Sequence, residues 1–317
     1  MIQQQKAKFP VCNKLKNHKS KYRTETDEDD LELPALIVMQ GMRGSGKTYA
    51  AVMLAKHFEK KKYVQRSFLI CPNVDKKPER DIYLANLSTL EEDDVCTDEN
   101  KFETAIAQVV ERVKQDWDEF EQYETHVKAY TKMLKADEPL TDEEHSILMA
   151  SGGMPPLREK KLKRHLLILD DCQGTHVYNQ KRASPLTHLS IRHRHIPITI
   201  LYLVQSWTGV PRTIRLNATH YCIFKTSDLQ QLEQIYSSFA NTVEKNIFMQ
   251  LYREATDDAH GFLFIDVVPK KEYMRFRKGF DTYLIPSELR NQSHTVEDPA
   301  PEKKNEEDED SRTQTST

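Results

Sequence analysis

Short runs of consecutive apolar residues alternate with amphipathic segments through most of this chain. Runs of four or five aliphatic residues between turn-forming residues are typical of strands buried on both faces of a sheet. Segments with an apolar residue at every third or fourth position are typical of helices packed on such a sheet. The alternation predicts an α/β fold, with a mostly parallel, doubly wound sheet and helices on both faces. The expected strands are 35–39, 67–71, 166–169, 196–205, 221–224, 261–267 and 273–276, and the expected helices lie near 51–58, 185–194, 229–239 and 242–253.

A long polar region, residues 75–164, interrupts this alternation. Within it, apolar residues recur every three or four positions from Phe102 to Leu134, which predicts one long helix with a single apolar stripe. Acidic residues at 91–94 and a Gly/Pro loop at 152–156 lie on either side of that helix. We interpret the region as a helical insertion. Two roles stay open for it: packing on the core, or binding a partner protein.

Charge is distributed unevenly along the chain, although the net charge is only −3. The first 24 residues contain seven Lys or Arg and no acidic residue, whereas residues 25–32 contain six carboxylates and no basic residue. The last segment, 291–317, is acidic and has almost no large apolar residues. Such compositions cannot bury a core, so we expect disorder in the basic-then-acidic N-terminal arm (1–33) and in this tail. The basic stretch is either a solvated tail or a contact for nucleic acid or another acidic surface.

The composition also excludes several classes of protein. No apolar run is long enough to span a bilayer, and the N-terminus has no apolar signal core. Five widely spaced cysteines without a Cys-x-x-Cys pair indicate reduced thiols and argue against a zinc site. We therefore expect a soluble, intracellular protein with one large core and no membrane partner.

One stretch carries a recognisable chemical pattern. It matches the phosphate-binding motif G-x-x-x-x-G-K-[ST], with the residues Gly41, Met42, Arg43, Gly44, Ser45, Gly46, Lys47 and Thr48. The stretch follows a predicted strand and precedes a predicted helix, as this motif requires. Backbone N–H groups of the loop and the helix N-terminus would surround the phosphates of ATP. Lys47 is expected to contact the β- and γ-phosphates, and the Thr48 hydroxyl is expected to bind Mg²⁺.

Two other predicted strands end in polar residues, and ligands of open α/β sheets bind at such carboxyl ends. Asp170 and Asp171 follow four aliphatic residues, and Gln205 ends the strand 196–205. Asp170 is expected to hold Mg²⁺ and Asp171 to polarise the attacking water. Gln205 is expected to contact the γ-phosphate or that water, because an amide both donates and accepts hydrogen bonds. The alternative is that these side chains only cap turns.

Hydrolysis also needs a positive charge on the γ-phosphate in the transition state, often an arginine from a neighbouring subunit. Arg215 is the first candidate and Arg192 the second, although solvation of either on the surface stays open. The nearby histidines lack acidic or Cys partners at ligand spacing, so we interpret them as part of a basic patch rather than a metal site. They are His188, His193 and His195.

In this order, the motifs resemble the genome-packaging ATPases of large double-stranded DNA viruses, the poxvirus-type group within the FtsK–HerA class of ring-forming P-loop motors. The residues that carry the resemblance are Gly41–Thr48, Leu166–Asp171, Arg192-His193 with the strand Ile196–Gln205, and Arg215–Thr219. The resemblance implies a five-stranded core in which the strand that ends in Gln205 lies between the strand before the P-loop and the strand with two acids. Two features depart from the class: Asp171 replaces the usual Glu of cellular motors, and the insertion is longer than expected.

The resemblance further implies a homo-oligomeric ring that moves duplex DNA into a capsid by hydrolysing ATP, within the infected cell's cytoplasm, at the viral assembly site or in the virion. The ATPase domain would be 34–290, with the insertion at about 75–164 and a possible contact with capsid proteins. Basic clusters would line the ring channel and hold DNA phosphates; they are 160–164, 181–182, 192–195 and 275–278. Two other functions stay open: a P-loop kinase with a small acceptor, and a nucleotide-gated ring scaffold.

Overall fold

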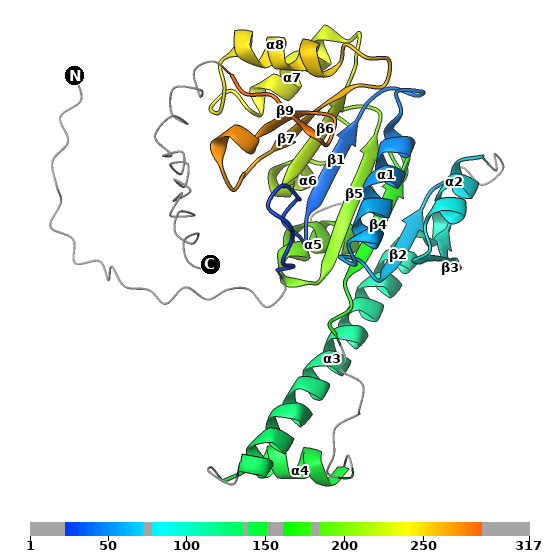
Figure 1. The fold of residues 1–317 in the computed structure, drawn as a ribbon. Coiled ribbons are helices and arrows are strands. Elements are labelled where there is room, and N and C mark those ends of the chain that lie inside the picture. Colours follow the sequence, from blue (N-terminus) through cyan, green and yellow to red (C-terminus); the bar gives the residue numbers. More distant parts are fainter. Residues whose placement is uncertain are drawn as a thin grey trace, which may run out of the picture.

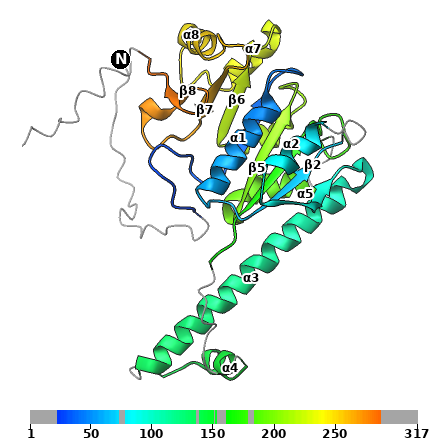
Figure 2. The ribbon, with the colours of Figure 1, turned by 45° about the vertical axis from the view of Figure 1, so that its right-hand side comes forward.

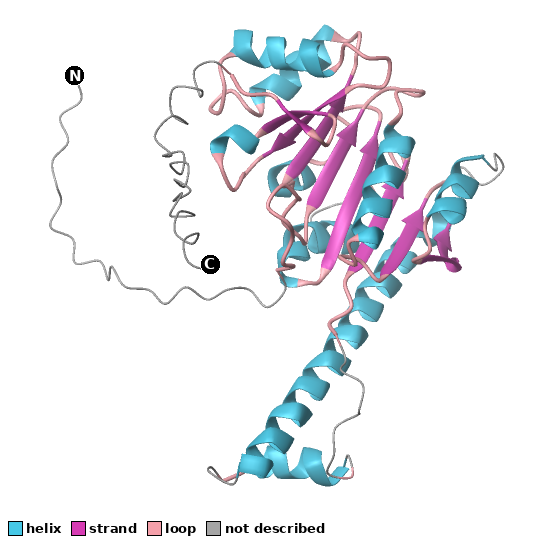
Figure 3. Cartoon of the chain, viewed as in Figure 1, coloured by secondary structure: helices cyan, strands magenta, loops and turns pink. Residues whose placement is uncertain are grey.

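A single large sheet organises the molecule (Figures 1 and 3). The computed structural model describes residues 23–72, 78–135, 139–150, 152, 161–178 and 184–286. In this part of the chain the sheet has the order β3-β2-β4-β5-β1-β6-β7-β8-β9, and it is parallel from β3 to β6 and antiparallel from β6 to β9. The strands are β1 (Leu36–Gln40), β2 (Arg66–Ile70), β3 (Leu90–Cys96), β4 (His165–Asp170), β5 (Ile198–Val204), β6 (His220–Phe224), β7 (Phe262–Asp266), β8 (Phe276–Lys278) and β9 (Thr282–Tyr283).

Helices cover both faces of this sheet, as the alternating pattern predicts. They are α1 (Lys47–Lys60), α2 (Pro78–Asn86), α3 (Phe102–Lys135), α4 (Asp142–Ala150), α5 (Pro185–Arg192), α6 (Arg212–Asn217), α7 (Leu229–Ser237) and α8 (Lys245–Ala255). Side chains of β1 alternate between two cores. Leu36 and Val38 belong to the core that also contains residues of α3 and of the helices α5, α6, α7 and α8, whereas Ile37 and Met39 belong to the core that contains residues of α1 and α2. Because β1, β4 and β5 are buried along their whole length, they read as continuous apolar runs in the sequence.

The sheet order confirms one expectation of the resemblance. β5, which precedes Gln205, lies between β1 and β4. Other elements were not expected: α2, α6 and the acidic edge strand β3 have no clear periodic apolar signal. The strand predicted at 273–276 lies further along the chain, because Glu272–Met274 form a short 3-10 helix and β8 begins only at Phe276. Cys71, Cys96, Cys172 and Cys222 form no disulfide.

The insertion contains the predicted long helix, which leaves the body of the molecule (Figure 2). The first turns of α3 bury Phe102, Ile106 and Val113 in the core. The rest of the helix extends beyond the sheet, and α4 packs against its far part (Figure 1). With 34 residues, α3 is about 50 Å long. Among the helices that the structure describes, none combines the length and apolar character needed to cross a bilayer.

Where α3 leaves the core, one buried carboxylate ties it to the sheet. Asp116 accepts hydrogen bonds from Lys163 at 2.7 Å and from His165 at 2.9 Å, and only 4% of Asp116 is exposed. Burial acts to raise the pKa of Asp116, but the bonds from Lys163 and His165 outweigh it and leave the pKa below its ordinary value. Helix α3 is thus fixed to His165, the first residue of β4.

The segment 23–33 differs from the disorder expected for it. Thr24 pairs with Leu33, and Leu31 and Leu33 are buried. Lys270 donates hydrogen bonds to three of its backbone carbonyls, those of Asp27, Glu28 and Asp30. The acidic stretch therefore packs on the sheet; the basic stretch 1–22 and the tail 291–317 lie outside the described residues.

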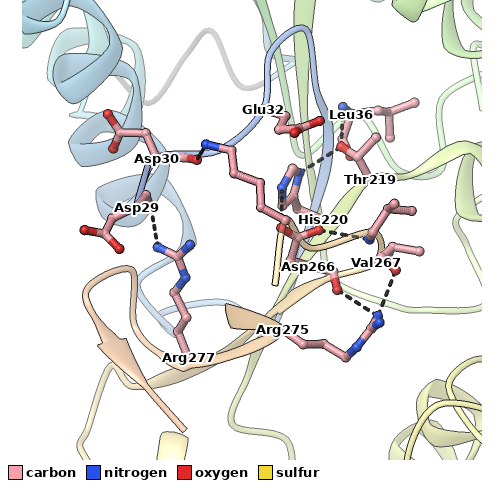
Figure 4. Close-up of polar contacts among 12 residues, drawn as sticks. Asp29, Asp30, Glu32, Leu36, Thr219, His220, Asp266, Val267, Arg275 and Arg277 are labelled. Carbon is pink, nitrogen blue, oxygen red and sulfur yellow. Dashed lines mark hydrogen bonds and ion pairs between the residues drawn. The ribbon is translucent and has the colours of Figure 1, made fainter. Parts of the chain in front are cut away.

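These contacts also correct the expectation that the cluster 275–278 lines a DNA channel. Arg277 is 6% exposed and donates to the carbonyl of Asp29 at 2.9 Å (Figure 4). Arg275 donates to the Val267 carbonyl at 2.8 Å and pairs with Glu272. Arginines engaged in this way hold the protein's own backbone and present little free charge. Of the other clusters, 181–182 and Lys160 lie outside the described residues.

Candidate active site

The loop from Gly41 to Gly46 joins the end of β1 to the start of α1. A side chain at position 41 would place its Cβ 2.6 Å from Ser45 Oγ and 2.7 Å from Phe224 Cβ, so only glycine fits there. Gly46 has φ of +98°, a left-handed conformation that glycine adopts without strain. The first turn of α1 contains no acidic residue, so its N-terminus keeps its full positive potential. Together these features form an anion-binding loop.

A cavity of about 500 Å³ opens beside this loop. It is lined by residues of the loop, of α1 and α2, and of the ends of β4 and β5: Arg43, Gly44, Ser45, Gly46, Lys47, Thr48, Tyr49, Ile82, Asp170, Asp171 and Gln205. Three strand ends separated widely in sequence therefore meet at one site. Gly41 and Met42 do not line the cavity, but their carbonyls accept hydrogen bonds from Lys47 Nζ at 2.6 and 3.0 Å and so hold this side chain.

Asp170 lies beside the P-loop threonine. Its Oδ2 atom accepts hydrogen bonds from Thr48 Oγ1 at 3.1 Å and from Tyr83 Oη at 2.9 Å, and the residue is 4% exposed. Burial raises the pKa of Tyr83 well above its ordinary value, so this phenol stays a neutral donor. The oxygen-rich pair of Thr48 and Asp170 suits the ligand preference of Mg²⁺. Nothing in the sequence near Tyr83 indicated this contact.

Asp171 and Gln205 contact each other at the mouth of the cavity. Gln205 Nε2 donates to Asp171 Oδ1 at 2.5 Å. Asp171 has φ of +54°, a left-handed conformation that Asp tolerates better than most residues. This turn directs the chain away from β4 after Asp170, so that the two neighbouring acids occupy different positions in the site.

A residue that the sequence analysis missed, Gln173, holds the backbone at Gln205. Its Oε1 accepts from the N–H groups of Gln205 and Ser206 at 2.8 and 2.9 Å, and its Nε2 donates to the Ser206 carbonyl at 2.7 Å. A Cβ at Gly209 would lie 1.8 Å from Nε2, so glycine leaves room for this amide. In the sequence Gln173 looks like any polar loop residue.

Neither candidate arginine lies in this cavity. Arg192 ends α5 and Arg215 belongs to α6, so both precede parallel strands and lie toward the edge of the sheet opposite the P-loop. The Arg215 guanidinium stacks over Trp207 at 5.5 Å and lines a separate hollow with Arg212.

One of the three histidines does not belong to a basic patch. Burial lowers the pKa of His193 from 6.5 to about 4, so its ring is neutral. Arg194 and His195 beside it are exposed.

Comparisons with known proteins give one family match and several similar solved structures. Residues 116–268 match the sequence family described as Poxvirus A32 protein. No curated protein matches the sequence. Among solved structures, the chain is similar to the genome packaging NTPase B204 from Sulfolobus turreted icosahedral virus 2 in complex with sulfate, with 13% identity and a TM-score of 0.44 over 74% of this chain and 92% of that chain. It is also similar to EssC (ATPases 2 and 3) from Geobacillus thermodenitrificans, with 14% identity and a TM-score of 0.41. That match covers 64% of this chain and 34% of the EssC chain.

Proposed function

We propose that this chain, whose residues 116–268 match the Poxvirus A32 protein family, is an ATP-hydrolysing motor that packages double-stranded viral DNA into a capsid. The family match confirms the resemblance inferred from the motifs. The observation that carries the proposal is the meeting of Lys47, Asp170, Asp171 and Gln205 around one cavity. An anion-binding loop, a pair of acids and a sensor amide are the parts that hydrolysis of ATP requires.

Each residue of the cavity has a separate task in this proposal. The loop N–H groups bind the phosphates, and Lys47 exchanges its contacts with the Gly41 and Met42 carbonyls for contacts with the β- and γ-phosphates. Thr48 and Asp170 would hold Mg²⁺, which supplies charge stabilisation on the phosphate oxygens. Asp171 accepts a proton from the attacking water.

Gln205, bonded to Asp171, orients that same water. The amide can donate to the carboxylate and still accept from the water through its oxygen. A neighbouring subunit's Arg215 would complete the site in a ring, because Arg215 does not line the cavity of its own chain. The motor acts where virions assemble in the infected cell.

Phosphate release with and without duplex DNA tests the proposal. A motor hydrolyses ATP faster when DNA is present, and Asp171→Asn abolishes that hydrolysis while nucleotide still binds. Consumption of ATP only with a nucleoside or nucleotide acceptor would instead identify a kinase. Assembly and biological activity that survive in Asp171→Asn without hydrolysis would identify a scaffold.

A further inference from the structure

The part of the insertion that leaves the core is more than a long helix. We define the arm as residues 117–135 of α3 together with α4. Three large apolar side chains at its tip are exposed, with 44% of Met133, 66% of Leu134 and 73% of Met149 accessible to solvent. They belong to the last turn of α3 and the last turn of α4, and these two helices pack together. Exposed apolar residues gathered on one projecting element mark an interaction surface.

The arm is also acidic. Its described residues include seven carboxylates and three lysines, and one lysine, Lys132, pairs with Glu144 at 3.0 Å. The carboxylates are Asp118, Glu119, Glu121, Glu124, Asp142, Glu143 and Glu144. A net charge of about −4 repels DNA phosphates, so the arm suits a protein surface of positive charge.

The same chain has such a surface. We define the basal hollow as the cavity of about 700 Å³ at the amino ends of β2 and β4. Five basic residues and two acidic residues line it: Arg23, Lys61, Lys62, Lys161 and Arg164 with Glu25 and Glu59. Arg23 pairs with Glu32 and Lys61 pairs with Asp27, so the positive charge that the hollow offers to a docking group comes from Lys62, Lys161 and Arg164. Tyr63, Val64 and Leu162 also line the hollow, but each is at most 7% exposed, so its surface is mainly polar.

One group in the basal hollow lacks a partner. Arg164 Nε is buried, and no described residue accepts a hydrogen bond from it. Burial lowers the pKa of Arg164, and the charge of Glu25 offsets this loss of water only in part. An acidic group that entered the hollow would relieve this cost.

The arm cannot reach the basal hollow of its own chain. α3 is one continuous helix whose far part points away from the sheet (Figures 1 and 2). A contact between these two surfaces therefore joins two copies of the chain. Because the surfaces differ, the contact is heterologous: it runs head to tail and closes into a ring when the rotation between copies permits.

We propose that the tip of the arm of one copy docks in the basal hollow of the next. Arm carboxylates meet Lys62, Lys161 and Arg164, and Leu134 and the exposed methionines cover the aliphatic stems of Lys62 and Lys161. Glu25 and Glu59 in the lining of the basal hollow would repel a polyphosphate, so the hollow fits a protein occupant better. The inference rests on the proposed function only in that a packaging motor works as a ring.

Mass photometry and sedimentation of the full chain test the contact, without DNA and with or without a non-hydrolysable ATP analogue. The wild type should self-associate, and more weakly as salt rises. The arm variant Leu134→Ser/Glu143→Lys and the hollow variant Lys62→Glu/Lys161→Glu should each associate at least about tenfold more weakly, since the first loses an apolar contact and an ion pair and the second replaces ion pairs by repulsion. All four positions are exposed, so both variants should fold.

Mixing the two variants gives a result that only a head-to-tail contact produces. The intact arm of the hollow variant can dock in the intact basal hollow of the arm variant, so the mixture should form heterodimers and nothing larger. The control variant Lys225→Glu/Arg253→Glu makes the same charge change at exposed positions elsewhere and should associate like wild type.

Three outcomes would overturn the proposal: a wild type that stays monomeric under all these conditions, variants that associate normally, or a mixture without heterodimers. If the hollow variant loses only DNA binding, the basal hollow is a DNA contact instead. Binding of a fluorescent ATP analogue is measured in parallel, because it reports on the nucleotide site separately from the docking contact.

Discussion

Gln173 offers a sharp test of how the site is held together. It makes three hydrogen bonds to the backbone of Gln205 and Ser206, and Gln173→Leu removes all of them while keeping similar volume. At about 1 kcal/mol each, these bonds limit the loss in unfolding free energy to about 3 kcal/mol. Gln205 is exposed, so water can replace part of this bonding, and a loss of about 1–2 kcal/mol is expected.

The effect on catalysis should be larger than the effect on stability. Without Gln173 the backbone at Gln205 is free to shift, and the amide that contacts Asp171 shifts with it. A displacement of about 1 Å in a positioning group costs about 100-fold in rate. We therefore expect kcat to fall by about two orders of magnitude with little change in nucleotide affinity, whereas Gln173→Glu, which keeps both accepting bonds, should fall between this variant and wild type.

Phosphate release at saturating ATP gives kcat, and urea unfolding gives stability. The control is Ser67→Ala, which removes a buried hydroxyl that contacts Thr89 at 2.6 Å, away from the nucleotide cavity. Ser67→Ala should lose stability and keep kcat. If Gln173→Leu loses stability as the control does and keeps its kcat, Gln173 does not position the sensor and the reasoning fails.

Three further predictions follow from the site and the core. Lys47→Ala should lose nucleotide binding, measured with a fluorescent ATP analogue, because no other lysine among the described residues lines the cavity. Tyr83→Phe removes the hydrogen bond to Asp170, so the magnesium concentration that gives half-maximal turnover should rise roughly tenfold; an unchanged magnesium titration would contradict this role. Burial lowers the pKa of His193 from 6.5 to about 4, so the unfolded chain binds one more proton in this range and stability falls as pH falls. The free energy of unfolding, measured with urea, should fall by about 3 kcal/mol between pH 6.5 and pH 4 because of this residue. In His193→Leu the dependence of that free energy on pH should correspond to one proton fewer.

The sequence predicted the nucleotide cavity because its chemistry depends on local patterns. Gly41 to Thr48 form a contiguous motif, and the acids after β4 and the amide after β5 each end an apolar run. Parallel strands place such ends at one edge, so local patterns become a three-dimensional site without further information.

Other features depend on contacts between distant segments, which no local pattern encodes. Tyr83 acts through one hydrogen bond to a residue 87 positions away, and Gln173 through three hydrogen bonds to residues 32 and 33 positions away. The acidic stretch 25–32 has the composition of a disordered segment, yet Lys270 and Arg277 bind its backbone and the buried Leu31 and Leu33 anchor it. The same contacts occupy arginines that composition alone assigned to DNA.

Strand β4 connects the long helix α3 mechanically to the P-loop. One end of this six-residue strand, His165, is bonded to the foot of the long helix, and the other end, Asp170, is bonded to the P-loop threonine. The strand spans about 16 Å, is paired on both sides and is buried throughout, so it is stiff along its axis. A pull on the projecting helix is therefore transmitted as strain to the Asp170 carboxylate beside the P-loop, so a mechanical load far from the cavity can alter the geometry inside it.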